Sequence, residues 1–131
     1  DGLSNINTAV WKIRIRENPL LQNIDALSGV TVSDGPLNNI EIARNNSLAN
    51  IDGLMGIDRW QDGSVNITFN PLLTNIDGLA NLSQLDSSIL RIDFNDSLQN
   101  IDGLSSLASA TFSYVNIENN NSLQNIDGLS S

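Results

Sequence analysis

The chain contains no cysteine and no histidine, and it is poor in basic and aromatic residues. Without cysteine it has no disulfide, no thiolate nucleophile and no cysteine-ligated zinc. Without histidine it lacks the commonest general base and the commonest metal ligand. These two absences exclude many classes of enzyme and metalloprotein. We therefore expect no enzymatic activity, no metal site and no cofactor.

Positive charge is also scarce, with 6 Lys+Arg against 15 Asp+Glu and a formal net charge of −9. A phosphate backbone or an anionic lipid surface would be repelled by this charge. No apolar run approaches the roughly 18 residues that a membrane-spanning helix needs. We therefore expect neither a nucleic-acid partner nor membrane insertion. The length of 131 residues suits one compact domain over 1–131, and a first residue of Asp1 instead of Met suggests a processed or excised piece.

An internal repeat dominates what is present. The pattern Asn-x-x-Leu-x-Asn-Ile-Asp-Gly-Leu occurs five times, with Ala26 as the one replacement of its glycine, at 18–27, 45–54, 70–79, 95–104 and 120–129. Its aspartates recur about every 25 residues, and Asp1 opens the series. A repeat of this length is typical of stacked architectures. We place the coils at approximately 1–24, 25–51, 52–76, 77–101 and 102–126, with 127–131 opening a further coil.

A short alternating segment precedes each motif, at 12–16, 39–43, 64–68, 89–93 and 114–118. Alternation with a period of two is typical of half-buried strands. The second and fourth residues of every segment are apolar, as in Ile40 and Ile42, so we expect them to point inward. The sequence therefore predicts an all-β, parallel β-helix-like solenoid of about five coils, with neighbouring strands about 4.8 Å apart. The alternative is a leucine-rich-repeat horseshoe.

Single residue types recur at fixed positions of the coils and predict ladders in the interior. The expected asparagine ladder is Asn18, Asn45, Asn70, Asn95 and Asn120, and the expected isoleucine ladder is Ile24, Ile51, Ile76, Ile101 and Ile126. The asparagine amides would satisfy backbone groups at the turns and bond to one another. A second asparagine column at 23, 50, 75, 100 and 125 is either another ladder or solvent-facing. We assign the Asp-Gly pair of each motif to a tight turn, with Asp bonding locally and Gly tolerating positive φ.

The consensus I-x-I-x-x-N-x-x-L-x-x-I-D-G-L resembles that of receptor L-domain-like repeats, which are relatives of leucine-rich repeats in cell-surface proteins. The spacing Asn-x-x-Leu, seen in Asn95-Asp-Ser-Leu98, departs from the Asn-x-Leu of ordinary leucine-rich repeats. The resemblance implies an extracellular or cell-surface, non-catalytic role in binding or structure. It transfers no functional residue, because its motif residues belong to the core and the turns.

Function is then expected on outward strand positions and in the arcs between motif and strand. The candidate interaction surface comprises Lys12, Arg14, Arg16, Glu41, Trp60, Arg91, Asp93, Tyr114 and Glu118. Lys12, Arg14 and Arg16 make one end of this surface basic, and Asp93 and Glu118 make the other acidic. Its expected partner is a protein or glycan ligand, or other copies of the chain. Trp60 is placed in an arc loop, as a recognition residue or a lid on the edge.

Four narrower possibilities concern single residues or residue pairs. Asp93 and Glu118 share a column in adjacent coils, as a glycosidase pair would, but an open sheet face leaves both in water and so argues against a raised pKa. A calcium site is not indicated, because the sequence contains no recognisable calcium-binding loop. For Phe69 and Phe94, which precede successive ladder asparagines, we expect core packing, with a small contact patch as the alternative. Of the Asn-x-Ser/Thr sequons, only those at Asn66 and Asn81 lie where a glycan fits.

Two roles follow from these expectations. The first is a structural or adhesive β-solenoid module of a secreted or cell-surface protein. The second is a self-assembling extracellular filament subunit, a homopolymer whose uncapped coils stack end to end, because both ends of the chain break the repeat at the same Asp-Gly-Leu-Ser.

Overall fold

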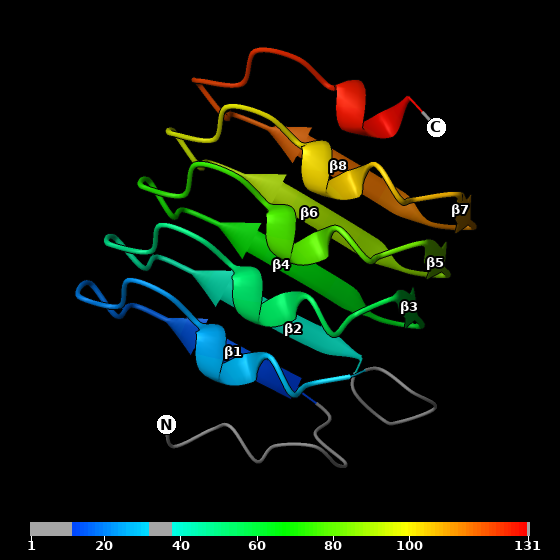
Figure 1. Cartoon of the computed structure of the whole chain (residues 1–131), viewed down its shortest axis with the longest axis horizontal. Helices are drawn as coiled ribbons and strands as arrows, with labels where there is room; N and C mark the ends of the chain where they lie inside the picture. Colours follow the sequence, from blue (N-terminus) through cyan, green and yellow to red (C-terminus); the bar gives the residue numbers. More distant parts are fainter. Residues whose placement is uncertain (1–11, 32–37, 131) are drawn as a thin grey trace.

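In the computed structural model of the chain, residues 12–31 and 38–130 are described. Their main element is a five-stranded parallel sheet with one strand from each repeat (Figure 1). Its strands, in order, are β1 (Lys12–Arg16), β2 (Asn39–Ala43), β4 (Ser64–Thr68), β6 (Ile89–Asp93) and β8 (Tyr114–Glu118). Each residue pairs with the equivalent residue of the next repeat, for example Ile40 with Val65. The predicted strands and their register are therefore confirmed.

Each motif ends in a 3₁₀ turn, and three of the arcs that follow the motifs add a short strand. The turns are η1 (Asp25–Leu27), η2 (Asp52–Leu54), η3 (Asp77–Leu79), η4 (Asp102–Leu104) and η5 (Asp127–Leu129). The short strands β3 (Arg59–Gln61), β5 (Gln84–Asp86) and β7 (Ser109–Thr111) form a second parallel sheet. The described residues contain no α-helix, so this part of the chain is all-β with parallel sheets. None of its helical turns is long or apolar enough to cross a membrane.

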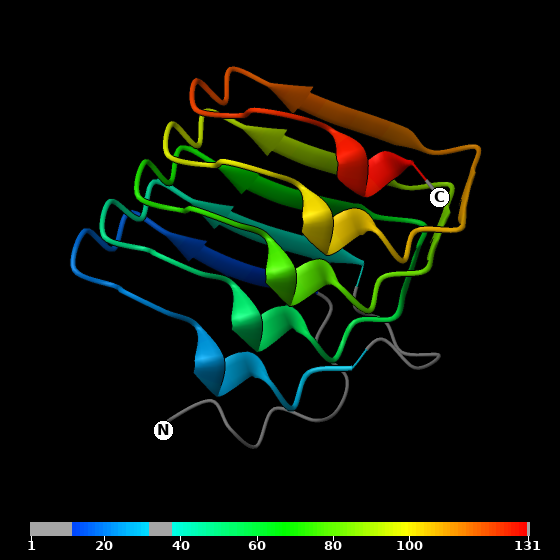
Figure 2. The same cartoon turned by 45° about the horizontal axis from the view of Figure 1, so that its top comes forward.

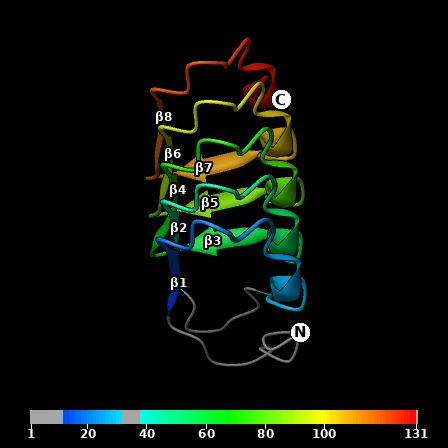
Figure 3. The ribbon, with the colours of Figure 1, turned by 90° about the vertical axis from the view of Figure 1, so that its left-hand side faces the viewer.

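The elements surround a common interior. The five-stranded sheet forms one layer, the row of 3₁₀ turns lies opposite it, and the three-stranded sheet lies near the amino ends of the long strands (Figures 1 and 2). Figure 3 shows the same stack from the side at which the long strands end. The first residue of each 3₁₀ turn is an aspartate, so Asp25, Asp52, Asp77, Asp102 and Asp127 line up along one edge. We call these five residues the acidic row.

The core fills the space between these layers with columns of isoleucine and leucine. The second and fourth residues of the three central long strands are buried, and so are the motif residues Leu73, Ile76 and Leu79 with their equivalents in the second and fourth repeats. Burial of these side chains supplies the main stabilisation of the fold. The period-two pattern thus fixes which face of the sheet is internal.

The predicted asparagine ladder is present as a chain of hydrogen bonds. In its central part, Asn70 Nδ2 donates to the backbone oxygen of Ile42 at 3.0 Å. Its Oδ1 accepts from the backbone N–H of Asn45 at 3.1 Å. Asn45, Asn70 and Asn95 are buried. The ladder therefore satisfies backbone groups at the point where the strands end and no sheet partner reaches them.

The second asparagine column makes a different, local bond. In each repeat its Oδ1 accepts from the backbone N–H two residues on, as when Asp77 N donates to Asn75 Oδ1 at 3.1 Å. The assignment of this turn bond to aspartate was wrong, because asparagine makes it. The expected positive φ of the motif glycines was also wrong, since no described glycine has one. The motif requires glycine because there is no room for a side chain. A Cβ on Gly78 would lie 1.9 Å from the backbone oxygen of Ile51.

Trp60 does not lie in a loop, as the sequence analysis expected. It is the central residue of β3, only 1% exposed, and its Nε1 has no hydrogen-bond partner. Alternation places its side chain inward, between polar Arg59 and Gln61. Its column continues with Leu85 and Ala110, so side-chain volume falls from repeat to repeat along this column. Trp60 is therefore a core residue and is removed from the candidate interaction surface.

Candidate functional site

The residue that follows each long strand adopts a left-handed backbone conformation. These residues are Glu17, Arg44, Phe69, Phe94 and Asn119, with φ of 59°, 58°, 56°, 55° and 52°. The backbone N–H of each of the first four still bonds to the next repeat, for example Phe69 N to the oxygen of Asp93 at 3.0 Å. The chain then turns into the buried ladder asparagine. The left-handed conformation thus joins the end of the strand to the ladder.

Bulky side chains are unusual at such positions. A left-handed conformation costs a non-glycine residue about 1–2 kcal/mol, and asparagine tolerates it best. Only Asn119 is of the favoured type. Glu17, Arg44, Phe69 and Phe94, which we call the strand-end row, keep larger side chains in spite of this cost. Strained positions of this kind are concentrated at functional sites, which makes the row a candidate.

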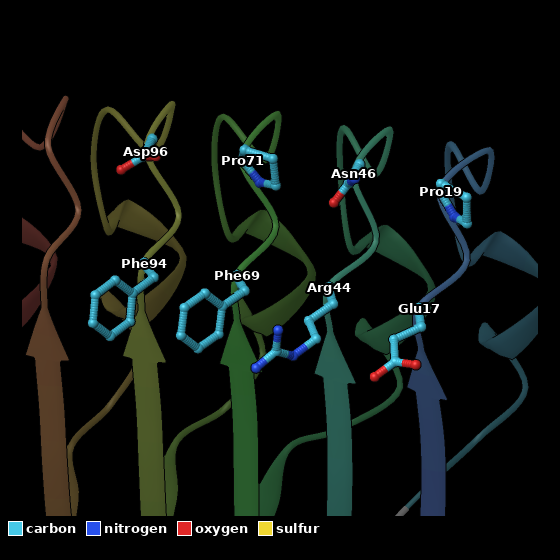
Figure 4. A pocket seen from close by; sticks show the side chains of 8 residues that line it. All are labelled: Glu17, Pro19, Arg44, Asn46, Phe69, Pro71, Phe94 and Asp96. Atoms are coloured by element: carbon cyan, nitrogen blue, oxygen red, sulfur yellow. The ribbon is translucent and has the colours of Figure 1, made fainter.

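Three side chains of the row form one continuous stack. The rings of Phe69 and Phe94 lie 4.5 Å apart at an interplanar angle of 4°. The guanidinium carbon of Arg44 lies 4.9 Å from the centre of the Phe69 ring on a cation–π contact. Figure 4 shows the side chains of the row projecting to the same side from successive strand ends. Phe69 and Phe94 are 40% and 37% exposed, so the expectation of core packing was wrong and the contact patch is what the structure contains.

The row forms one wall of an open groove with a volume of about 650 Å³. The other wall comes from the turns that follow the strands, through Pro19, Asn46, Pro71 and Asp96 (Figure 4). Leu20 and Leu72 follow the two prolines and are exposed. The groove therefore runs across four repeats and offers an apolar middle between two carboxylates, Glu17 and Asp96.

Five of the six cations of the chain belong to the long strands or to the residues that follow them. Lys12, Arg14, Arg16 and Arg91 lie in long strands, Arg44 lies in the strand-end row, and Arg59 alone lies in the second sheet. Within the described part of the chain, Arg44 forms no ion pair with a carboxylate. Asp96 accepts a hydrogen bond from Asn121 Nδ2 at 2.7 Å, which fixes its position at the far end of the groove.

The basic end of the predicted surface is partly neutralised. Arg14 Nε lies 2.7 Å from one carboxylate oxygen of Glu41, and Arg16 Nε lies 3.2 Å from the other. Glu41 thus bridges two arginines of the neighbouring strand. Lys12 is exposed at the start of β1.

Asp93 departs from the expectation that it lies in water. Its side chain is fully buried although it points to the outer face of the sheet, and its Oδ1 has no partner. Its Oδ2 accepts a hydrogen bond from Arg91 Nε. That hydrogen bond, with the attraction of the Asp93 charge, raises the pKa of the Arg91 guanidinium. Glu118, the register partner of Asp93, is exposed.

Tyr114 is exposed at the start of β8 and pairs in register with exposed Ile89, away from the groove. The two sequon asparagines differ in exposure. Asn81 is exposed and donates from Nδ2 to the backbone oxygen of Met55 at 2.8 Å, whereas Asn66 is half-buried and donates to Ser64 Oγ at 3.0 Å. Among the described residues, no group of three or more acidic side chains is placed to hold a metal ion.

The sequence analysis gave Phe69 and Phe94 as a contact patch only as an alternative, and it did not select the strand-end row as a whole or the turns opposite it. Its signal was present, because the position before the ladder asparagine reads Glu, Arg, Phe, Phe and Asn in successive repeats, next to positions that hardly vary. Comparison of the chain with known protein families, with curated proteins and with solved structures finds no match. The geometry of the chain itself is therefore the basis for a function.

Proposed function

We propose that the chain is a non-catalytic adhesive module of a secreted or cell-surface protein, with the groove beside the strand-end row as its ligand surface. One observation carries the proposal. Four bulky side chains stand next to one another at backbone positions that favour glycine or asparagine, and three of them stack. Folding alone would be served better by asparagine at each position, as in Asn119.

We also propose the finer architecture, a β-solenoid of about five coils of about 25 residues, similar to L-domain-like repeats. Equivalent residues pair from repeat to repeat in both sheets, and each motif glycine from Gly53 onward lies against the backbone of the preceding repeat. The 3₁₀ turns and the second sheet occupy the place that helices take in a horseshoe. These features support a solenoid over the helix-backed alternative.

The surroundings of Asp93 and Glu118, the two carboxylates that a glycosidase would need, support a non-catalytic role. Asp93 is occupied by its hydrogen bond with Arg91, and Glu118 is solvent-exposed. A general acid needs a raised pKa from desolvation without a cation beside it. The chain also lacks histidine and cysteine.

The test compares the wild-type chain with the double variant Phe69→Asn/Phe94→Asn on arrays of random peptides and of glycans. Asparagine suits the left-handed backbone, so the variant should fold, which circular dichroism and thermal melting would verify. We expect ligands that the wild type binds and the variant loses. Phe112→Asn is the matched control, since Phe112 is 92% exposed with a φ of 50° but lies in the turn after β7. Binding patterns that are the same for all three proteins would overturn the proposal.

End-to-end assembly is the second candidate, and one observation favours it. Ile126 is 60% exposed, whereas its equivalent Ile101 is fully buried beneath the next repeat. A further repeat stacked on this face, from the same chain or from another copy, would bury Ile126. Negative-stain electron microscopy over a concentration series tests assembly by copies. Filaments that disappear in Ile126→Asp would establish it, and dispersed particles at every concentration would exclude it.

A further inference from the structure

The stack in the strand-end row ends at the second face of Phe94, which we call its open face. Arg44 covers one side of Phe69, and Phe94 covers the other. Phe94 has Phe69 on one side only, and the equivalent residue of the next repeat is Asn119. Among the described residues, neither a ring nor a cation lies over the second face of Phe94. The Phe94 ring is 37% exposed and lines the groove, so a ligand group that prefers aromatic surfaces can reach it.

The groove also carries a negative charge in the same repeat as this ring. Asp96 lies two residues after Phe94, lines the same groove and is held by Asn121 (Figure 4). A planar cation between Phe94 and Asp96 would combine a cation–π contact with a charge-assisted hydrogen bond. The stack already contains the cation–π part of this arrangement once, in Arg44 over Phe69.

The remaining walls indicate what should surround that cation. Pro71 and the exposed ring edges make an apolar middle, and Leu72 extends it at the rim. The lining carries Glu17, Asp96 and Arg44, and the Glu17 carboxylate also lies 3.7 Å from Arg16, so the negative charge of the groove comes mainly from Asp96, on a chain whose net charge is −9. Charge complementarity thus favours a basic ligand. A sugar ring is disfavoured, since it stacks on aromatic faces and three of the four faces of this phenylalanine pair are covered.

We propose that the groove binds an extended segment of a partner protein that carries an arginine flanked by apolar residues. The guanidinium lies on the open face of Phe94 with Asp96 as its counter-ion, and the apolar neighbours lie along Pro71 and the ring edges. This inference rests on the proposed function, since it names the ligand of the same groove.

The test measures binding of the purified chain to fluorescently labelled peptides in solution by fluorescence polarisation, and to immobilised peptides by array capture. The probes are Leu-Arg-Leu peptides with blocked ends, together with a random-peptide array. In matched probes the arginine is replaced by citrulline, which keeps the shape and removes the charge, or by glutamate. The protein variants are Asp96→Asn and Phe94→Asn, with Asp58→Asn and Phe112→Asn as controls outside the groove.

We expect the citrulline probe and the Asp96→Asn variant each to weaken binding about tenfold or more, and the two controls to leave binding unchanged. Peptides that require Phe69 and Phe94 but bind equally with arginine or citrulline would overturn the inference and leave the proposed function standing. Binding that no groove variant alters would overturn both. If no peptide binds, the inference fails, and the glycan array decides the proposed function.

Discussion

Asn70 donates two hydrogen bonds to the Oδ1 atom of Asn95, one from its backbone N–H at 3.1 Å and one from its Nδ2 at 3.3 Å. One side-chain oxygen thus holds both the backbone and the side chain of the neighbouring repeat. The same Nδ2 also donates to the backbone oxygen of Ile42. Every ladder asparagine in the centre of the stack therefore acts as donor and acceptor at once, while asparagines of the second column act as acceptors.

This difference predicts opposite outcomes for one isosteric change. Asn70→Asp removes the donor to Ile42 and buries a charge, so we expect a loss of about 3 kcal/mol or more in the free energy of unfolding. Asn75→Asp keeps the acceptor for the N–H of Asp77, so we expect a loss below about 1 kcal/mol. Urea denaturation of the two variants measures both values. Equal losses would contradict the assigned hydrogen-bond pattern.

Gly78→Ala tests the close approach of successive repeats. The added Cβ would lie 1.9 Å from the backbone oxygen of Ile51, which belongs to another repeat and cannot yield without moving the stack. We expect a loss of about 2–3 kcal/mol in thermal or urea unfolding. Exposed Leu72→Ala in the same repeat is the control and should change stability little. A stable Gly78→Ala protein would show that the repeats are farther apart than described.

The Arg91–Asp93 pair predicts non-additivity between two substitutions. Arg91→Asn alone leaves a fully buried carboxylate without its donor, so we expect the free energy of unfolding to fall. Adding Asp93→Thr reproduces Asn66 and Thr68 of the preceding repeat and should restore most of the loss. Unfolding free energies of the two single variants and the double variant give the coupling. Additive losses would mean that the pair does not interact.

The acidic row predicts a dependence of stability on salt. Its five aspartates repeat at the spacing of the strands, about 5 Å, so each carboxylate faces like charges on neighbouring repeats. Added salt screens this repulsion, and we expect the melting temperature to rise with sodium chloride concentration. Asp77→Asn should flatten that rise, whereas Asp58→Asn outside the row should not. A melting temperature that is independent of salt would contradict the prediction.

Much of the fold follows from the sequence because the repeat samples the same environment five times. A single Ile-x-Ile segment is ambiguous, but Ile40, Val65 and Leu90 at one position define an inward column, and the structure pairs them in register. The ladder of Asn18 and its equivalents was predictable for the same reason. Where every repeat needs the same hydrogen bonds or the same buried side chain, the same residue type stands at that position in every repeat.

Two residues that the sequence analysis misplaced, Trp60 and Asp93, have surroundings that occur once in the chain. Trp60 follows charged residues in a segment whose length varies between repeats. The three-residue alternation of β3 was therefore too short to distinguish a strand from a loop. Asp93 occupies an outward position, and its burial depends on packing around the strand end that no local pattern encodes. The strand-end row was missed because its members have no chemical type in common. What they share is a backbone conformation, which becomes visible only in three dimensions.

The column of Trp60, Leu85 and Ala110 bears on how a repetitive chain avoids misassembly. When repeats are nearly identical, a strand can pair with the wrong repeat, one position further along the stack, and still keep its other contacts. This mispairing would place an indole where the interior has room only for a smaller side chain, or leave a void where the indole belongs. The decrease in side-chain volume along this column therefore fixes the position of each repeat in the stack. The buried indole nitrogen without a hydrogen-bond partner is part of the energetic cost of this specificity.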